Sequence, residues 1–399
     1  GWGHSFAWGF SIRRESSLVT KGISGRVVFN LPEADGEEQI VRGWRLTGGR
    51  GEYRVETGDE FEHVFRPLDA ERLEYRLTQI VYRGQRQIQL SYDAVGRLVS
   101  ITDSAGRRVL FHPHVSGRIG SITCTDPTSQ RTITFARYEY DAEGHLASST
   151  DADGFTTKYD YREGALLSAL KYPDGPRFHF VYDSQDRCVE TWGDYDGATD
   201  PALDPDLPPL LADGFTKAKG VHHCIFTYGA NGFSEYADSV RVERFHVDED
   251  GKLQKAVSAA GATTTTYDEN GFVASKTDET GATTRYMRDE RGRIMQEIDA
   301  LGQSVRVLRD SGGRPIKNFD AAGGVIECTR DHYGNVLTVK NQVGAVTSYT
   351  YDDLGLMSSK TDPNGGKTTY KGDEHGNLSE IVAPNGAVWR FRHDYFGRP

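Results

Sequence analysis

The sequence contains little cysteine, little methionine and no long apolar run. Its four cysteines, Cys124, Cys188, Cys224 and Cys328, lie far apart in 399 residues and form no Cys-x-x-Cys pair. A disulfide framework uses a much denser set of cysteines, so we expect these to be free thiols. No apolar run approaches the ~18 residues of a transmembrane helix, and residues 1–20 lack the apolar core of a signal peptide. We therefore expect no membrane span, and export without a classical signal peptide.

Basic residues are outnumbered by acidic ones. The chain has 47 Lys and Arg against 58 Asp and Glu, a net charge of −11 and a pI near 5.6. A nucleic-acid binder needs a basic face that neutralises phosphates, so we expect no nucleic-acid partner. Glycine is abundant, at 45 residues, beside 20 Tyr, 18 Phe and only 3 Met. Many glycines and aromatic residues with few helix formers indicate strands joined by tight turns.

An internal repeat dominates the sequence. The glycine of an Asp-x-x-Gly motif, or a close variant, returns every 21 residues after a first step of 20, and a second glycine series falls between these positions. The first series is Gly251, Gly271, Gly292, Gly313, Gly334, Gly355, Gly376 and Gly397, and the second is Gly261, Gly281, Gly302, Gly323, Gly344, Gly365 and Gly386. Each unit holds two turns and two strands. The repeat therefore predicts an all-β fold, a long antiparallel meander with no helix longer than two turns in residues 241–399.

The turn chemistry follows from the motif. Asp at the first position of a type I turn bonds the backbone two residues on, and Gly at the fourth position suits a left-handed conformation. Such a three-residue loop pairs the residue before Asp with the residue two after Gly. The predicted pairs are Tyr92 with Leu98, Tyr140 with Leu146, Tyr267 with Val273, and Tyr351 with Met357. One face of the sheet then carries an aromatic and aliphatic column, in which Cys328 is a packing residue, and the other face is polar.

The repeat length raises a question of parity. Twenty-one is odd, while strand side chains alternate between the two faces of a sheet. One turn must differ by a residue, or each unit must contain one extra bulge, because the aromatic positions keep one face throughout. We place the difference at the second turn, where Thr277 would pair with Ala282. This register keeps Tyr286 and Arg288 on the face of Tyr267.

The repeated segments resemble the YD repeat of the Rhs family. Tyr92-Asp93-Ala94-Val95-Gly96-Arg97-Leu98 and Tyr351-Asp352-Asp353-Leu354-Gly355 carry the motif, and residues 76–190 and 241–399 follow it. The opening Gly1-Trp2-Gly3-His4-Ser5-Phe6 is similar to the region that precedes the repeats in Rhs toxins. The resemblance implies a large sheet that curls into a hollow β-cocoon, related to the shells of Tc-toxin C components and of teneurins.

In the bacterial toxins of this family, the cocoon encloses a C-terminal toxin domain. The resemblance thus implies the structural shell of a secreted polymorphic toxin, made in the cytoplasm and exported for interbacterial competition. Its implied partners are the toxin domain as enclosed cargo and either type VI secretion components of the spike or PAAR type or a Tc partner. The family's Asp-Pro-x-Gly-Trp core, associated with self-cleavage, does not occur in this sequence. We therefore expect the cargo to lie outside these residues and no cleavage activity within them.

The period divides the chain into four parts. Residues 1–75 alternate like strands without the 21-residue period, and we expect a β segment that starts or plugs the shell. Residues 76–190 and 241–399 are the two repeat arrays. Residues 191–240 form an inserted region rich in Asp and Pro with irregular strands, because prolines at this density cannot lie inside a sheet.

Two clusters have residue types that bind metals. The aspartates of the insertion, Asp194, Asp196, Asp200, Asp204 and Asp206, could converge on a calcium ion, but the EF-hand order is absent and a solvated acidic loop is the preferred interpretation. His222-His223-Cys224 could suggest zinc, but adjacent residues of a strand point to opposite faces and no second ligand pair follows. We predict no metal site and no cofactor.

Catalytic patterns are absent from the sequence. The motif aspartates are explained by turns, and there is no Gly-x-Ser-x-Gly elbow, phosphate loop or dinucleotide fingerprint, so we predict no enzyme. Three functions compete: an encapsulating shell, a cell-surface or carbohydrate-binding adhesion module, and a hydrolase hidden in the loops. The sheet favours the shell, since about 25–30 strands about 4.8 Å apart make a ribbon long enough to curl through a full turn. A carbohydrate binder would instead cluster its aromatic residues on loops.

Overall fold

A single antiparallel sheet makes up the molecule. The computed structural model describes residues 8–13, 16–21, 25–30, 37–49, 51–58, 60–67, 74–83, 86–195 and 210–399. These residues form 35 strands and no helix, and almost every strand pairs with its neighbours in sequence. The expected all-β meander is therefore confirmed, including residues 241–399, all of which are described. None of the described residues form a helix long and apolar enough to cross a membrane.

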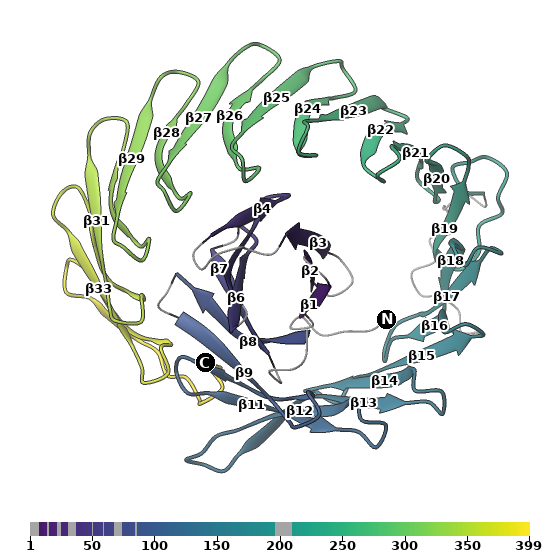
Figure 1. The fold of residues 1–399 in the computed structure, drawn as a ribbon, viewed down its shortest axis with the longest axis horizontal. Helices are drawn as coiled ribbons and strands as arrows, with labels where there is room; N and C mark the ends of the chain where they lie inside the picture. The colour runs from purple at the N-terminus through teal and green to yellow at the C-terminus, as the bar shows by residue number, and fades with distance from the viewer. Residues whose placement is uncertain are drawn as a thin grey trace.

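The first eight strands curl into a small barrel at the centre of the molecule (Figure 1). They are β1 (Trp8–Arg13), β2 (Ser16–Lys21), β3 (Gly25–Asn30), β4 (Gln39–Val41), β5 (Trp44–Gly49), β6 (Glu52–Glu56), β7 (Phe61–Pro67) and β8 (Glu74–Tyr82). Strand β1 turns back onto β8, where Phe10 pairs with Tyr75. The barrel is filled by side chains that are fully buried, among them Phe29, Leu46 and Phe65. This is the hydrophobic core of the described chain.

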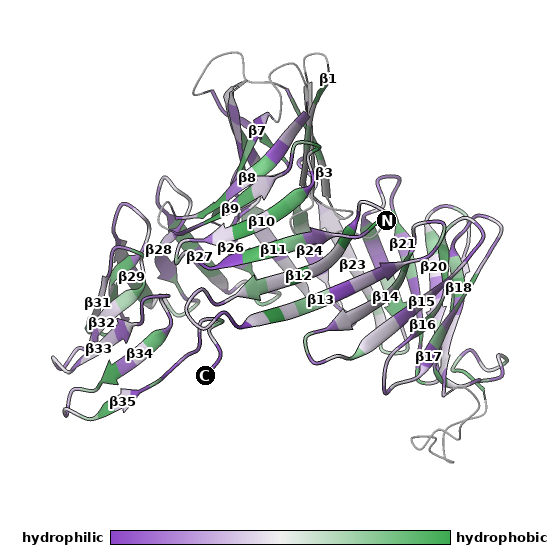
Figure 2. Ribbon diagram, turned by 90° about the horizontal axis from the view of Figure 1, so that it is seen from below, coloured by the Kyte–Doolittle hydropathy of each residue, from purple (hydrophilic) through white to green (hydrophobic). Residues whose placement is uncertain are grey.

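From β9 onward the sheet leaves the barrel and winds around it as a long wall (Figure 1). The wall begins with β9 (Arg86–Tyr92), β10 (Leu98–Asp103), β11 (Arg108–Pro113), β12 (Ile119–Thr125), β13 (Thr132–Tyr140), β14 (Leu146–Asp151), β15 (Thr156–Arg162), β16 (Leu166–Lys171), β17 (Arg177–Tyr182), β18 (Cys188–Asp194), β19 (Val221–Tyr228), β20 (Phe233–Ala237) and β21 (Val242–Val247). Strands β18 and β19 pair directly, so the sheet continues across the Asp- and Pro-rich interruption. Seen from the side, the barrel rises at one end of the ring (Figure 2).

The most regular part of the wall follows. It consists of β22 (Leu253–Ser258), β23 (Gly261–Tyr267), β24 (Val273–Thr277), β25 (Thr283–Arg288), β26 (Ile294–Ile298), β27 (Ser304–Arg309), β28 (Pro315–Phe319), β29 (Val325–Arg330), β30 (Val336–Lys340), β31 (Val346–Tyr351), β32 (Met357–Thr361), β33 (Lys367–Gly372), β34 (Leu378–Val382) and β35 (Val388–Arg390). Strand β35 pairs only with β34, so hydrogen bonds between strands do not close the ring.

The predicted turn geometry is confirmed. In the first repeat, the Asp93 carboxylate accepts hydrogen bonds from the backbone N–H groups of Val95 (3.1 Å) and Arg97 (2.9 Å), and Gly96 has a φ of 82°. The four predicted cross-strand pairs all occur: Tyr92 with Leu98, Tyr140 with Leu146, Tyr267 with Val273, and Tyr351 with Met357.

One glycine of the second series departs from the expected turn. Ser258 pairs with Gly261 across a two-residue turn, so Gly261 begins a strand and does not close the loop. Ser258 stands where neighbouring units carry Asp or Asn at the start of the turn, and its hydroxyl accepts a hydrogen bond from the Ala260 N–H at 3.2 Å, whereas Asp278 accepts from two backbone N–H groups. This shorter turn lies in the unit whose repeat length is 20 residues.

A β-bulge after the first turn of each unit absorbs the odd repeat length. Tyr267 pairs with Val273 and Thr266 pairs with Ser275, so Ala274 has no partner across the strands. The same register shift recurs through the following units. One residue per unit thus drops out of the alternation, and the aromatic positions return to the same face.

Our placement of the odd residue at the second turn is wrong. Thr277 pairs with Thr283 and not with Ala282. The second turn copies the first because Asp278 also accepts two backbone hydrogen bonds, from Thr280 and Ala282. With the same Asp-to-Gly spacing, both turns form the same three-residue loop, and the parity has to be corrected elsewhere.

Candidate functional site

The aromatic face of the sheet is the inner face of the ring. In the barrel, the buried side chain of Val55 pairs with His63, His63 with Ile80, and Ile80 with Ile88. Ile88, Leu90 and Tyr92 are every second residue of β9 and therefore share one face of the sheet. The face that fills the barrel thus becomes the aromatic face of the wall. The sheet curls in one direction from the barrel outward (Figure 1). The aromatic column therefore faces inward along the wall.

This inner face is apolar but largely uncovered. Among the described residues, no buried hydrophobic side chain lies beyond Ala237 in the sequence. On the inner face of the later strands, Val305 is 47% exposed, Ile326 39% and Trp389 51%. A sheet face of this composition is normally covered by a second layer. The wall is thus a single layer whose inner side is free to contact another polypeptide.

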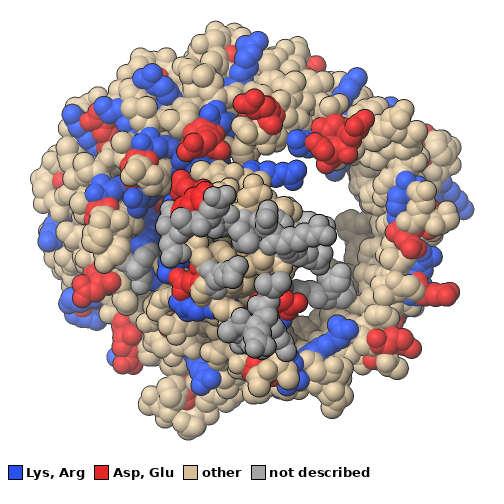
Figure 3. All heavy atoms as spheres, viewed as in Figure 1, with Lys and Arg blue, Asp and Glu red and all other residues tan. Residues whose placement is uncertain are grey.

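The solvent-accessible area shows the same openness. The structure exposes 23992 Å². A compact monomer of 44.3 kDa exposes only about 15,500 Å². A space-filling view shows the hollow between the barrel and the wall, which opens toward the viewer on the right (Figure 3).

In five successive units of the wall, a side-chain hydrogen bond links the unit to the one before it. The residue before the motif Asp donates a side-chain hydrogen bond to the backbone carbonyl two residues after the preceding glycine. Tyr267 bonds the carbonyl of Leu253 at 2.8 Å, Tyr351 that of Val336 at 2.9 Å, Arg288 that of Val273 at 2.9 Å, Arg309 that of Ile294 at 3.0 Å, and Arg330 that of Pro315 at 3.1 Å. These carbonyls lie beside the bulge, where the regular ladder is interrupted. Tyr and Arg are therefore interchangeable here as donors.

The barrel end of this array shows the same bond in its most buried form. The Tyr92 hydroxyl donates to the carbonyl of Leu77 at 2.7 Å. Burial raises the pKa of Tyr92 to about 12, so the hydroxyl keeps its proton at neutral pH.

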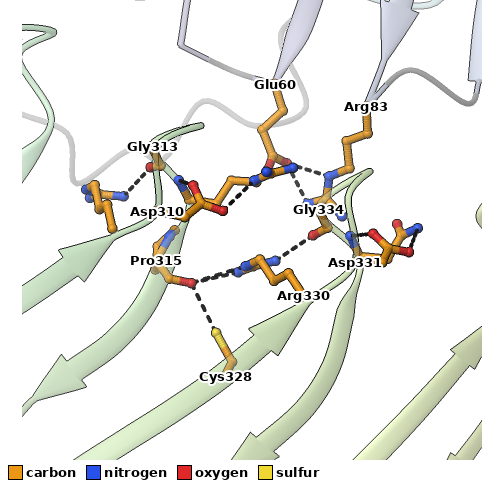
Figure 4. A network of polar contacts seen from close by, with 12 residues as sticks. Glu60, Arg83, Asp310, Gly313, Pro315, Cys328, Arg330, Asp331 and Gly334 are labelled. Carbon is orange, nitrogen blue, oxygen red and sulfur yellow. Dashed lines mark hydrogen bonds and ion pairs between the residues drawn. The ribbon is translucent and has the colours of Figure 1, made fainter.

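Three arginines at this position also bind the turn of their own unit. Arg330 donates to the carbonyl of Gly334 at 2.8 Å as well as to Pro315, while the Cys328 thiol lies 3.0 Å from the same Pro315 oxygen (Figure 4). Cys328 is on the inner face, in the position expected for a packing residue. All four cysteines are free thiols.

The turn aspartates carry their negative charge in a well-bonded site. The backbone N–H of Arg97 and then its guanidinium lower the pKa of Asp93. At Asp289, burial acts to raise the pKa, but hydrogen bonds from Arg293 outweigh it and the net shift is downward. The Arg293 guanidinium lies 2.7 Å from the Asp289 carboxylate. The turn aspartates and these arginines therefore bond each other within the turn.

Barrel and wall touch along a polar seam. Arg291, at the tip of a wall turn, pairs with Glu56 of β6 at 3.2 Å, and the Arg291 side chain is only 10% exposed. A side chain at Gly43, where φ is +80°, would meet the backbone oxygen of Arg291 at 2.6 Å. Farther along, a cavity of about 590 Å³ lies between β7–β9 and the turns of the last repeats, lined in part by Phe61 and Leu356.

The residues considered for metal binding have other roles or lie outside the described part. Asp194 pairs with His179 at 2.6 Å, whereas Asp196, Asp200, Asp204 and Asp206 are not among the described residues, nor is the opening Gly1–Phe6. His222 is exposed, while the buried His223 bonds the Glu190 carboxylate at 2.9 Å. Cys224 lies 3.4 Å from the Tyr236 hydroxyl.

One further cluster has metal-ligand residue types. Asp141, Glu143 and His145 offer atoms within 4.8 Å of one another. Asp141 is a turn aspartate, and His145 stands where other units place the arginine that pairs with it. The cluster is therefore an ordinary turn of the repeat. Sequence reasoning missed the Tyr and Arg bonds to the bulge, although the alternation of Tyr and Arg before Asp was visible in the sequence.

The fold matches known toxin shells. The crystal structures of TcdB2-TccC3-TEV and of TcdB2-TccC3 without its hypervariable C-terminal region align over 92% of this chain, with TM-scores of 0.52 and 0.51 and identities of 13% and 15%. The chain spans 23% and 22% of the length of those proteins. At such identity the likeness establishes the fold.

Sequence comparisons point to the same group. The double-stranded DNA deaminase toxin A of Burkholderia cenocepacia (strain H111) is 26% identical over 137 residues, which cover 33% of this chain and 9% of that protein. The RHS Repeat family matches residues 76–108, 267–304 and 330–367, and the Teneurin YD-shell family matches residues 128–191. Together with the 21-residue units, these matches show that the chain carries repeats similar to the RHS and YD-shell repeats.

Proposed function

We propose that this chain is wall material of a toxin-encapsulating shell, and that its inner face encloses the toxin domain of the parent protein. The observation that supports this most is the single-layer curled sheet, whose aromatic inner face stays partly exposed along its whole regular part. The described chain buries that face most completely in the barrel and in the first wall strands, where Leu90, Leu98, Ile101 and Phe111 extend the core. A polypeptide held inside the ring would cover the rest.

The comparisons support a container more than a catalyst. The matched families are repeats and shells, and the matched solved structures share the curled wall. The deaminase toxin aligns over only 9% of its length, so its named activity is a property of that protein. We propose that this chain itself performs no catalysis, and that chemistry resides in the cargo.

The adhesion alternative receives less support. An adhesion module would cluster its aromatic residues on loops, whereas the tyrosines at the repeat positions of this chain lie on strands and bond backbone carbonyls of the preceding unit.

As for location and partners, we propose a secreted bacterial effector that works with a delivery apparatus, either of the type VI spike or PAAR kind or a Tc partner. In this arrangement the barrel plugs one end of the shell.

Protease protection tests the enclosure. The chain is produced with a small, protease-sensitive reporter fused after Pro399, and cleavage of the fused reporter is compared with that of the same reporter free in solution. We expect slower cleavage of the fused reporter, because the C-terminal end lies within the outline of the ring in Figure 1, where a Cβ at Gly397 would lie 3.3 Å from the Arg107 guanidinium. Equal cleavage of the fused and the free reporter would contradict enclosure.

A further inference from the structure

Three arginines on the inner face lack a carboxylate partner. Arg288, Arg309 and Arg330 occupy the position before the motif Asp in three consecutive units, and within the described residues their guanidinium groups bond only carbonyl oxygens. Carbonyl oxygens satisfy the N–H groups but do not neutralise the charge. We call these three residues the inner arginine strip.

Several other cations of the wall have a carboxylate partner. On the rim, Arg293 pairs with Asp289 at 2.7 Å and Arg314 with Asp310 at 3.0 Å. On the outer face, Lys371 pairs with Glu380 at 2.7 Å. The inner arginine strip differs from these pairs, since its three guanidinium groups bond carbonyl oxygens of the described residues in a chain whose net charge is −11.

The groups around the strip include a further positive charge. Burial and then the charge of Arg293 lower the pKa of Arg309, although the charge of Asp289 acts to raise it. The Arg309 Nε is buried without a hydrogen-bond partner. Nearby, Glu60 of the barrel is already bound by Arg83 at 2.5 Å (Figure 4), and on the same face of the wall Glu297 is the exposed carboxylate of the neighbouring strand.

The spacing of the strip fits an extended peptide. The three arginines lie on β25, β27 and β29, so successive guanidinium groups are two strands, or about 10 Å, apart. A polyproline II segment rises about 3.1 Å per residue and presents the same face every third residue, so three residues cover roughly that distance. Carboxylates at every third residue of such a segment would meet successive arginines.

We propose that the inner arginine strip binds an acidic segment of the enclosed polypeptide. The inference rests on the proposed shell function and names the chemistry of its contact with the cargo. A carboxylate-bearing segment would supply the charge that the wall lacks, and at a partly buried site such pairs gain from reduced screening by salt. Nucleic acid is the disfavoured occupant, because the net charge of −11 opposes its entry from outside, whereas the enclosed polypeptide is already held within the ring in the proposed shell.

The sequence itself provides the variant that tests the strip. Tyr267 and Tyr351 make the same carbonyl bond without a charge, so the triple variant Arg288→Tyr, Arg309→Tyr and Arg330→Tyr removes three charges and keeps the donors. A matched control, Arg285→Gln, Arg306→Gln and Lys340→Gln, removes three cations from the outer face. Circular dichroism and thermal unfolding of both triples establish that they are folded.

Binding is measured by fluorescence anisotropy on the full 399-residue chain at low ionic strength. The probes are a labelled 20-residue Glu- and Gly-rich peptide, a Lys-rich peptide of equal length and a single-stranded oligonucleotide. We expect the acidic peptide to bind, and the inner triple to weaken it by about tenfold while the outer triple changes it by less than about twofold.

Three outcomes would overturn the strip: no binding of the acidic peptide, equal weakening by both triples, or tighter binding of the oligonucleotide than of the peptide. Each is distinguishable from failure of the shell proposal. Protease protection of the C-terminal reporter does not depend on the acidity of the reporter, so protection together with any of these outcomes would leave enclosure standing and remove only the strip.

Discussion

The barrel and the wall are built from one continuous sheet but are stabilised in different ways. In the barrel, Phe29, Leu46 and Phe65 are fully buried in a dry core. In the wall beyond Ala237, no described hydrophobic side chain is buried, and stability comes from repeated local bonds: the turn aspartate and the Tyr or Arg that holds the bulge. The same inner face thus forms the packed core in the barrel and stays available for contact along the wall.

The sharpest way to break this comparison is to remove one aromatic ring from each region. Phe65→Ala should lower the free energy of unfolding of the barrel by about 3–5 kcal/mol, because it leaves a cavity in a close-packed core. Trp389→Ala in the wall removes an inner-face side chain that is 51% exposed and should cost about 1 kcal/mol or less. Hydrogen exchange followed by mass spectrometry reads the two regions separately. Similar losses of protection in both would show that the wall has a core after all.

Acid should affect the wall through many small contributions. The pKa values of turn aspartates such as Asp93, Asp183 and Asp310 are lowered in the folded state, so their stabilisation is fully present above the unfolded pKa of about 3.9. It is lost as the pH falls through the lower folded values. Stability of the wall, followed by hydrogen exchange or thermal unfolding, should be flat from pH 8 to about 5 and fall below about pH 4. A decrease beginning near pH 6.5 would instead implicate histidines.

The bond to the bulge is tested at Arg330. Arg330→Ala leaves the Pro315 carbonyl without its charged donor and should destabilise the local unit by about 1.5–3 kcal/mol. Arg330→Tyr restores a donor and should recover most of that loss, because Tyr351 makes the same bond one unit later. If Tyr destabilises as much as Ala, the bond does not explain why these two residues alternate.

A gain of stability is expected where the bond is missing. Gly372 stands in the Tyr or Arg position, and a side chain built there would meet its nearest atom at 3.6 Å, an ordinary contact. Gly372→Tyr should donate to the carbonyl of Met357 and stabilise the unit by about 0.5–1.5 kcal/mol. The control Gly372→Phe adds the ring without the hydroxyl. Equal stabilisation by both would assign the gain to strand propensity alone.

Local chemistry explains what could be predicted from the sequence. The turns and the pair Tyr92–Leu98 follow from Asp and Gly spacing within seven residues, and the structure confirms them. Gly261 was the exception, because Ser258 replaces the turn Asp and the loop shortens. The odd repeat length correctly required that one residue per unit drop out of the alternation between faces. A shorter turn and a β-bulge both satisfied that requirement. The bond that accompanies the bulge joins residues about 15 apart on different strands, for example Arg330 and Pro315.

Contacts between barrel and wall lay beyond sequence reasoning. The pair Glu56–Arg291 joins residues 235 apart, and no periodicity connects them. The inner arginine strip was hidden for a related reason. Its charges stand out only once strand pairing shows that their face is the inner one and that a neighbouring cation such as Arg293 has a carboxylate partner.

Small-angle X-ray scattering of the full chain tests the central claim, a hollow curled wall around a small barrel, most directly. A compact globule of 399 residues has a radius of gyration of about 21 Å, and an unfolded chain of this length about 70 Å. The structure predicts a value clearly above about 21 Å but far below about 70 Å, with the broad distance distribution of a hollow particle. A radius of gyration at about 21 Å with a single symmetric distance peak would contradict it.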